Sequence, residues 1–192
     1  MLHSDNAEIQ YGNGDSYKGV ISQGRKNGAG GVYTYRNGDV YEGRFQNDRK
    51  SDQSGKMKYG RLDVQYYGEF KDDRKIGKGV LEFGENGQLG FYKGELDSNE
   101  ELCGKNQTFE FPQQKMVYTG DFSKNQFHGD GQIHHQDTGN VFKGQFLHGY
   151  KHGRAQFILS EASKLRDGKA IFKGVFEYNL EIRKESNYGL RY

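Results

Sequence analysis

The 192-residue sequence contains no tryptophan, one proline and one cysteine, Cys103. A single cysteine excludes a disulfide within the chain and fits a reducing compartment. There is no run of about 20 apolar residues that could span a membrane, and the N-terminal region holds no apolar stretch of signal-peptide length. These absences lead us to expect a cytoplasmic protein.

The sequence also lacks an excess of either charge and has few aliphatic residues. The chain has 28 basic and 26 acidic residues, a net charge of +2, so nothing in its charge indicates nucleic acid as a partner. Only 32% of the residues are hydrophobic, against about 45–50% apolar residues, glycine included, in ordinary domains. That shortage argues against a thick globular core. A disordered chain is the first alternative, but disordered chains have few aromatic residues.

Aromatic residues and glycine are abundant instead. The chain has 14 tyrosines, 13 phenylalanines and 29 glycines. Burying a large apolar side chain contributes roughly 1.5–3 kcal/mol. Because leucine, isoleucine and valine are few, the aromatic residues must supply most of the burial. We therefore expect a thin, elongated protein whose core is an aromatic stripe.

The aromatic residues recur in a repeat. An aromatic-x-Gly motif appears every 24 to 30 residues, and a further apolar residue such as Phe45 or Phe70 usually follows two positions after the glycine. This period of two is typical of a β-strand. The motif begins at Tyr17, Tyr41, Tyr66, Tyr92, Tyr118, Phe142 and Phe172.

Each repeat unit has a second half that also alternates. Glycines eleven and thirteen residues after the lead aromatic, such as Gly77 and Gly79, precede an aromatic or apolar pair such as Tyr33 and Tyr35. A turn such as Asn37-Gly38 then leads to the next unit. Each unit is thus interpreted as a β-hairpin, and hairpins must stack to bury a continuous stripe.

The predicted fold is all-β: an elongated, single-layered antiparallel sheet of about seven stacked hairpins. We assign residues 1–9 to an N-terminal segment, 10–180 to the hairpin array and 181–192 to a C-terminal tail. Residues 97–116 and 160–171 fit the repeat poorly and are interpreted as long hairpin loops, the second with a short helical turn. Glycine weakens a strand, so its fixed place in the repeat predicts that a ring from a neighbouring strand lies flat over bare backbone.

The pattern Y-x-G-x-F-x-x-G-x-x-x-G-x-G-x-x-x-Y-x-x-G resembles the MORN repeat (membrane occupation and recognition nexus). The unit from Tyr17, "YKGVISQGRKNGAGGVYTYRNGDV", matches well. The second unit departs from the pattern, with Asp48, Asp52 and Ser54 at glycine positions. The resemblance implies a twisted, single-layered sheet with a groove of aromatics and glycines. It also implies kinship with small stand-alone scaffolds of cytoskeletal and ciliary assemblies.

No motif in the sequence indicates catalysis. The G-x-G pairs lack the third glycine and following helix of a nucleotide-binding fingerprint. The histidines between residues 128 and 152 do not have metal-ligand spacing, and Cys103 has no catalytic pattern around it. We therefore expect no enzyme activity, no cofactor and no metal.

Two surfaces could bind a partner. The first is an aromatic groove, because a single-layered sheet cannot cover both faces and an exposed apolar area marks an interaction site. Packing within the core is the other interpretation of each ring, and both stay open. The groove residues are Tyr41, Phe45, Tyr66, Phe70, Tyr92, Tyr118, Phe122, Phe142 and Phe146.

The second surface is a row of basic hairpin turns. Solvated turns that discourage edge pairing are one interpretation, and an edge for anionic headgroups or acidic protein tails is the other. Aspartates such as Asp48 and Asp72 interrupt the row, which favours protein over lipid. The basic edge comprises Arg25, Lys26, Arg49, Lys50, Arg74 and Lys75.

The leading hypothesis is a non-enzymatic scaffold that binds protein partners through the groove and the sheet ends. By the family resemblance, its home would be a multi-subunit cytoskeletal complex, with the ciliary axoneme as one example. The alternative is a peripheral module that binds phosphoinositide or other anionic lipid.

Overall fold

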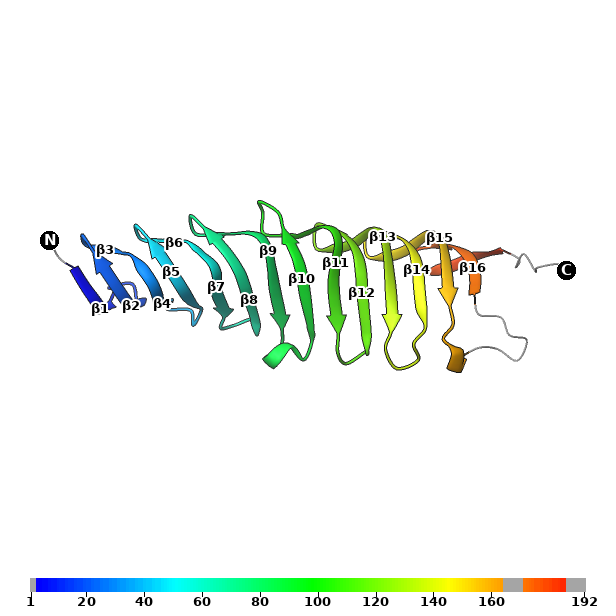
Figure 1. Cartoon of the computed structure of the whole chain (residues 1–192), viewed down its shortest axis with the longest axis horizontal. Helices are drawn as coiled ribbons and strands as arrows, with labels where there is room; N and C mark the ends of the chain where they lie inside the picture. The colour runs from blue at the N-terminus through cyan, green and yellow to red at the C-terminus, as the bar shows by residue number, and fades with distance from the viewer. Residues whose placement is uncertain (1–2, 164–170, 186–192) are drawn as a thin grey trace. The chain divides into compact units, whose positions relative to one another are not determined.

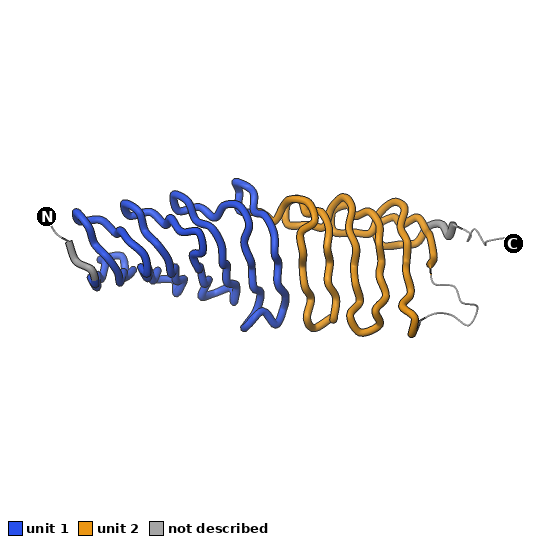
Figure 2. Tube along the Cα trace, in the orientation of Figure 1, with its two compact units in different colours: residues 1–100 blue, residues 101–192 orange. Residues whose placement is uncertain are grey.

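The computed structural model describes residues 3–163 and 171–185 and confirms an all-β fold. The described residues form antiparallel strands and two short 3-10 helices, with no α-helix among them. The chain divides into two compact units, residues 1–100 and 101–192 (Figure 2). Within each unit the strands form a single layer, and hairpins follow one another in chain order (Figure 1).

The first unit contains strands β1 to β10 and the 3-10 helix η1 (Glu85–Gly87). The strands are β1 (His3–Gln10), β2 (Ser16–Ser22), β3 (Arg25–Lys26), β4 (Gly28–Thr34), β5 (Val40–Gln46), β6 (Arg49–Lys50), β7 (Asp52–Tyr59), β8 (Val64–Lys71), β9 (Arg74–Phe83) and β10 (Gly90–Leu96).

The second unit contains strands β11 to β17 and the 3-10 helix η2 (Glu161–Ser163). Its strands are β11 (Leu102–Phe111), β12 (Met116–Ser123), β13 (Gln126–His135), β14 (Val141–Leu147), β15 (Tyr150–Ile158), β16 (Ile171–Glu177) and β17 (Leu180–Glu185). Each pairs antiparallel with the next along the chain.

The seven predicted hairpin starts are present. Each lead aromatic is the second or third residue of a strand: β2, β5, β8, β10, β12, β14 or β16. The sheet extends beyond the predicted array at both ends, since β1 pairs with β2 from His3 and β17 continues past residue 180. The predicted loop over 97–116 is wrong, because β11 occupies half of it. The predicted helical turn is η2, and residues 164–170 lie outside the described residues.

Regular strand pairing aligns the glycines in a row that crosses the strands. Gly68 lies opposite Gly55 on one side and Gly79 on the other. In the first hairpin the row passes through Gly31, opposite Gly43. The second glycine of the first two units is therefore Gly31 and Gly55. Counting thirteen residues from the lead tyrosine gives Gly30 and Ser54 for this position. The count is one short because these two hairpins carry one more residue before the second glycine.

Rings do cover this bare backbone, although the first ring comes from the glycine's own strand. A Cβ added to Gly43 or Gly120 would lie under 3.0 Å from the hydroxyl oxygen of the tyrosine two residues earlier, closer than real Cβ atoms approach. The neighbouring hairpin contributes the second ring. A Cβ on Gly55 would lie 2.7 Å from Phe70 Cδ2 and 3.1 Å from Tyr41 Cε2.

Each lead tyrosine leans along its strand to reach a carbonyl oxygen. The Tyr17 hydroxyl donates to the Val20 carbonyl at 3.0 Å, and the Tyr118 hydroxyl donates to the Asp121 carbonyl at 2.9 Å. The carbonyl of Asp121 follows a register shift after Gly120. In the partner strand Gly129 has φ +57°, which favours glycine. Such a bulge bends a strand, and the tip of the hairpin turns toward the rings.

Edge-to-face ring pairs join one hairpin to the next. Phe45 packs against Tyr17 at 5.3 Å and against Tyr41 at 5.2 Å, with interplanar angles of 84° and 85°. In the second unit Phe146 joins Tyr118 and Phe142 in the same way. Aromatic pairs of this geometry contribute about 0.5–1.5 kcal/mol beyond their burial. These shared rings form the core.

Hydrogen bonds from turn side chains fasten both ends of the hairpins. At the tips, the Asp73 N–H donates to the Lys50 carbonyl at 3.1 Å, and its carboxylate accepts the Lys50 N–H at 3.0 Å. At the opposite end, the Asp39 carboxylate of an Asn-Gly-Asp turn accepts the Gly60 N–H at 3.0 Å. Each hairpin therefore aligns its neighbour.

We expect Gly120→Ala to destabilise the protein by about 1–3 kcal/mol, the usual cost of overpacking. Its Cβ would meet backbone atoms, the Gly131 Cα at 2.6 Å and the Asp130 oxygen at 2.7 Å, which cannot move aside like a flexible side chain. Gly12→Ala is the matched control, since nothing lies within 4 Å of its Cβ. Urea unfolding measures both, and equal effects would contradict the steric explanation.

Candidate functional site

The nine predicted groove residues are core residues. None has more than 5% of its surface exposed, and Tyr41 and Tyr66 have none. They therefore cannot be the surface that a partner touches, and the core-packing interpretation holds for all of them. The buried residues are Tyr41, Phe45, Tyr66, Phe70, Tyr92, Tyr118, Phe122, Phe142 and Phe146.

Partly exposed rings lie beside them on the same face, which we call the ring face. Tyr33 pairs with both Tyr17 and Tyr41, and so stands between two buried tyrosines. These rings come from the second strand of each hairpin, in the alternating pairs of the repeat. Sequence alternation identifies the pairs, but it cannot tell which strand's rings are overlaid. The partly exposed rings are Tyr33, Tyr35, Tyr59, Phe83, Phe109, Phe111 and Phe157.

The three lysines of the predicted basic edge lie over the rings instead of projecting from the turns. Lys26 Nζ is 5.1 Å from the ring centroid of Tyr33, and Lys50 Nζ is 5.6 Å from that of Tyr41. Lys75 Nζ is 5.5 Å from the ring of Tyr66, with only 11% of its side chain exposed. Cation–π attraction and burial of the lysine stems explain this position. The basic edge is therefore wrong for Lys26, Lys50 and Lys75.

The arginines of the same turns are exposed, as predicted for an edge. Arg25, Arg49 and Arg74 alternate along their strands with the inward lysines. Arg49 forms an ion pair with Asp72 at 3.1 Å, and both side chains are more than half exposed. Exposed pairs of this kind contribute little stability. The edge thus carries mixed charge.

Carboxylates compensate the half-buried lysines of the first unit. Lys26 Nζ lies 3.6 Å from an Asp48 oxygen, and Lys75 donates to the Glu100 carboxylate. Burial opposes ionisation of Glu100, but the hydrogen bond and charge of Lys75 outweigh it, so the Glu100 pKa is lowered. In the first unit the ring face therefore presents rings together with the ammonium groups of Lys26 and Lys75, which are already paired.

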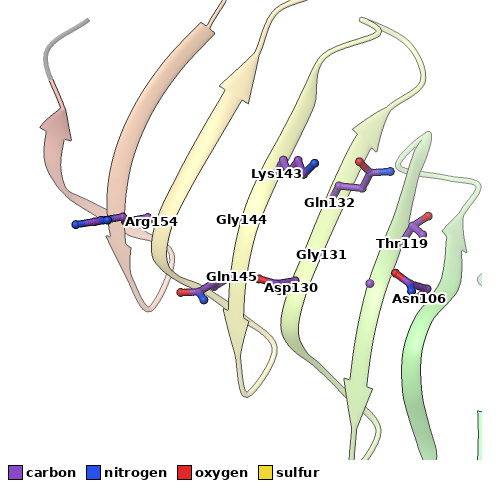
Figure 3. A pocket seen from close by; sticks show the side chains of 10 residues that line it. Asn106, Thr119, Asp130, Gly131, Gln132, Lys143, Gly144, Gln145 and Arg154 are labelled. Carbon is purple, nitrogen blue, oxygen red and sulfur yellow. The ribbon is translucent and has the colours of Figure 1, made fainter. Parts of the chain in front are cut away.

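The opposite face carries a polar trough in the second unit. It crosses strands β11 to β15, with a volume of about 800 Å³ and a floor that includes Gly120, Gly131 and Gly144 (Figure 3). Thr119, Gln132 and Lys143 lie in one row along it. These side chains can hydrogen-bond a polar ligand, but they do not pair a nucleophile with a base.

The described residues contain no group of three or more His, Cys, Asp or Glu side chains that could hold a metal ion. His128 and His148 lie near each other, with ring centroids 6.0 Å apart, and Cys103 is partly exposed. None of the helices in the described ranges is long and apolar enough to cross a membrane.

No protein-family model matches the sequence, and neither does any curated protein. The resemblance to MORN repeats consequently remains an interpretation of the repeat pattern.

The buried tyrosines should make the protein unstable in alkali. Burial, then the charges of Glu100 and Glu69, raise the pKa of Tyr66 to about 12 from 10.0. Burial raises the pKa of Tyr41 and Tyr118 as well. The folded protein therefore holds protons that the unfolded chain releases, so its stability is complete below pH 10 and falls as the pH rises above it.

Tyrosinate absorbance and circular dichroism, followed together against pH, measure this effect. We expect part of the tyrosinate signal to appear only as the sheet unfolds, while in denaturant all tyrosines titrate in one step. Complete titration with an intact β-sheet spectrum would contradict it.

Proposed function

We propose that this protein is a non-enzymatic scaffold that binds protein partners through the ring face of its hairpin array. The supporting observation is the row of partly exposed rings from the second strands, which continues from hairpin to hairpin in the first unit. In the second unit the partly exposed Ile133 of β13 stands between Phe109 and Phe157, so the row there is apolar but not aromatic throughout. An isolated surface ring needs no explanation, but a contiguous apolar row marks an interaction site. An amphipathic helix or an extended peptide could lie along it.

Charge on the ring face supports protein over lipid as the ligand. Lys26 and Lys75, which would have to meet anionic headgroups, already pair with Asp48 and Glu100. A juxtaposed basic residue contributes about 1 kcal/mol to membrane binding only when its charge is available. Peripheral binding of phosphoinositide or anionic lipid therefore remains the weaker alternative.

The assembly to which the scaffold belongs is proposed from the repeat pattern alone. The pattern resembles MORN proteins of cytoskeletal and ciliary complexes, so we place the protein in such a complex. Among the described residues β1 pairs with β2 and β17 pairs with β16, so the other edge of each strand offers backbone groups for end-to-end contacts with other subunits.

Photo-crosslinking in the source cells tests the ring face. A benzophenone amino acid replaces Tyr59 or Phe157, one ring-face position in each unit. Matched controls carry it at Lys58 and Gln156, adjacent exposed residues of the same strands that point to the opposite face. We expect one protein partner to crosslink from the ring-face positions and not from the controls. Equal crosslinking from both faces would contradict the proposal.

Once that partner is purified, Tyr59→Ser with Phe157→Ser should weaken its binding at least roughly tenfold, about 1.4 kcal/mol. Arg49→Ser with Arg74→Ser should leave the affinity nearly unchanged. Circular dichroism confirms that each variant is folded. Vesicles of phosphatidylserine and phosphoinositide should not sediment the protein at physiological salt. Vesicle binding that is lost when Arg49 and Arg74 are neutralised would instead favour the lipid alternative.

A further inference from the structure

One residue at the tip of each hairpin lies at the same place in the repeat, immediately after the tip turn and over the rings. We call it the tip residue. The turn of the following hairpin supplies a hydrogen-bond partner to its backbone. The tip residues are Lys26, Lys50, Lys75, Leu102, Phe127 and Lys151, and their turn partners are Asp48, Asp73, Glu100, Asn125, Gly149 and Asn179.

In five of these six pairs the partner is acidic where the tip residue is a lysine and neutral where the tip residue is apolar. The turn partners of Lys26, Lys50 and Lys75 are the acidic residues Asp48, Asp73 and Glu100. The carboxylates of Asp48 and Glu100 pair with the ammonium groups of Lys26 and Lys75. Asp73 instead accepts the Lys50 backbone N–H, and the Lys50 ammonium donates to the Tyr35 hydroxyl at 3.0 Å. The apolar tip residues Leu102 and Phe127 face the neutral Asn125 and Gly149. An ammonium group held over rings and away from water needs a compensating anion, whereas an apolar side chain needs none.

Lys151 is the exception to this match. Its Nζ lies 4.4 Å from the ring centroid of Phe142, closer than the other tip lysines lie to their rings. Its turn partner is Asn179, whose amide oxygen accepts the Lys151 N–H at 2.8 Å and whose own N–H donates to the Lys151 carbonyl at 3.1 Å. The backbone bonds are kept, and the carboxylate is missing.

No other described residue supplies that carboxylate. Among the side chains that the structure describes, ion pairs within 4.0 Å form at Lys26 and Lys75 but at neither Lys50 nor Lys151. The Lys50 ammonium donates instead to the Tyr35 hydroxyl at 3.0 Å. Glu181, at the tip position of the next hairpin, is exposed. Burial lowers the pKa of Lys151, and no neighbouring charge opposes that effect. The ammonium group is therefore desolvated without compensation.

We propose that Lys151 is a recognition site for a side-chain carboxylate, aspartate or glutamate, of a protein partner lying on the ring face. This inference rests on the proposed function and names one contact of the partner. The partner's carboxylate does for Lys151 what Glu100 does for Lys75 within the chain. The partly exposed ring of Phe176, whose centroid lies 5.3 Å from that of the buried Phe142, adds apolar surface beside it.

The test uses the whole protein, with NMR of the lysine side-chain carbons. The probe is the blocked peptide Ac-Phe-Asp-Phe-NH2, and its control is Ac-Phe-Asn-Phe-NH2. We expect the aspartate peptide to shift the Lys151 signal saturably and to bind at least roughly tenfold more tightly than the asparagine peptide, because charge-assisted hydrogen bonds are the stronger ones. Equal binding of the two peptides would overturn the inference.

Two variants that follow the repeat's own chemistry sharpen the test. Asn179→Asp supplies the missing carboxylate, as Asp48 does for Lys26 at the equivalent turn, so it should weaken the aspartate peptide roughly tenfold and raise the Lys151 pKa. Glu100→Gln removes the carboxylate that pairs with Lys75 while keeping an oxygen for the Lys75 backbone N–H, so the Lys75 signal should become a second one that responds. Unchanged peptide binding in Asn179→Asp would overturn the inference.

The same variant separates this inference from the proposed function. If the purified partner binds Asn179→Asp as tightly as the unmodified protein, the Lys151 contact is wrong while the ring face still stands. If the partner ignores the ring face altogether, crosslinking at positions 59 and 157 fails, whatever the peptide result. In that case the proposed function falls, and a carboxylate-specific Lys151 shift would still assign the local site.

Discussion

The fold depends on one close contact, a tyrosine ring lying on the bare backbone of a glycine two residues further along its own strand. The ring occupies the place of a Cβ, so glycine is required at that position. Its hydroxyl bonds the carbonyl one residue beyond the glycine, as Tyr41 does with Arg44 at 3.0 Å. One side chain thus buries its ring, satisfies backbone at an irregular point and directs the hairpin tip toward the rings. The ring pairs and the tip residues all follow from that position.

This arrangement explains how so few hydrophobic residues can hold the sheet together. Four phenylalanines of the core serve two hairpins each, as Phe70 does by packing against Tyr41 at 5.0 Å and Tyr66 at 5.4 Å. The others are Phe45, Phe142 and Phe146. The lysine stems then cover the rings that the sheet leaves open, and only their ammonium groups need polar partners. Charged residues therefore contribute to the core, which makes composition alone a poor guide to its size.

Periodicity predicted most of the fold, because a hairpin repeat repeats its side-chain spacing. The strands, the lead aromatics and the turns could be predicted from Tyr17, Gly19 and their successors. Spacing could not show how deeply each ring is buried. Tyr41 and Tyr59 look equivalent in the sequence, yet only Tyr59 stays partly exposed, since the tip of the bent hairpin covers the other. The same bend moved Lys50 from an expected edge to a position over the rings. One extra residue before Gly55 hid the glycine row, because a bulge between Asp52 and Gly55 adds a residue to one strand and shifts the register there.

Where one residue departs from the repeat, a second residue in contact with it usually changes in a way that compensates. In the sixth hairpin Phe142 lacks the hydroxyl of the five lead tyrosines, and Ala155 replaces the second glycine. A Cβ on Gly144 would meet the Cβ of Ala155 at 2.5 Å, whereas a Cβ on the equivalent Gly120 would meet the hydroxyl of Tyr118. The alanine methyl thus takes space that a leaning tyrosine occupies elsewhere. Charge follows the same logic at the tips, where lysine comes with a carboxylate and an apolar residue comes without one. A departure that lacks its compensation, as at Lys151, therefore marks a place where the isolated chain is incomplete.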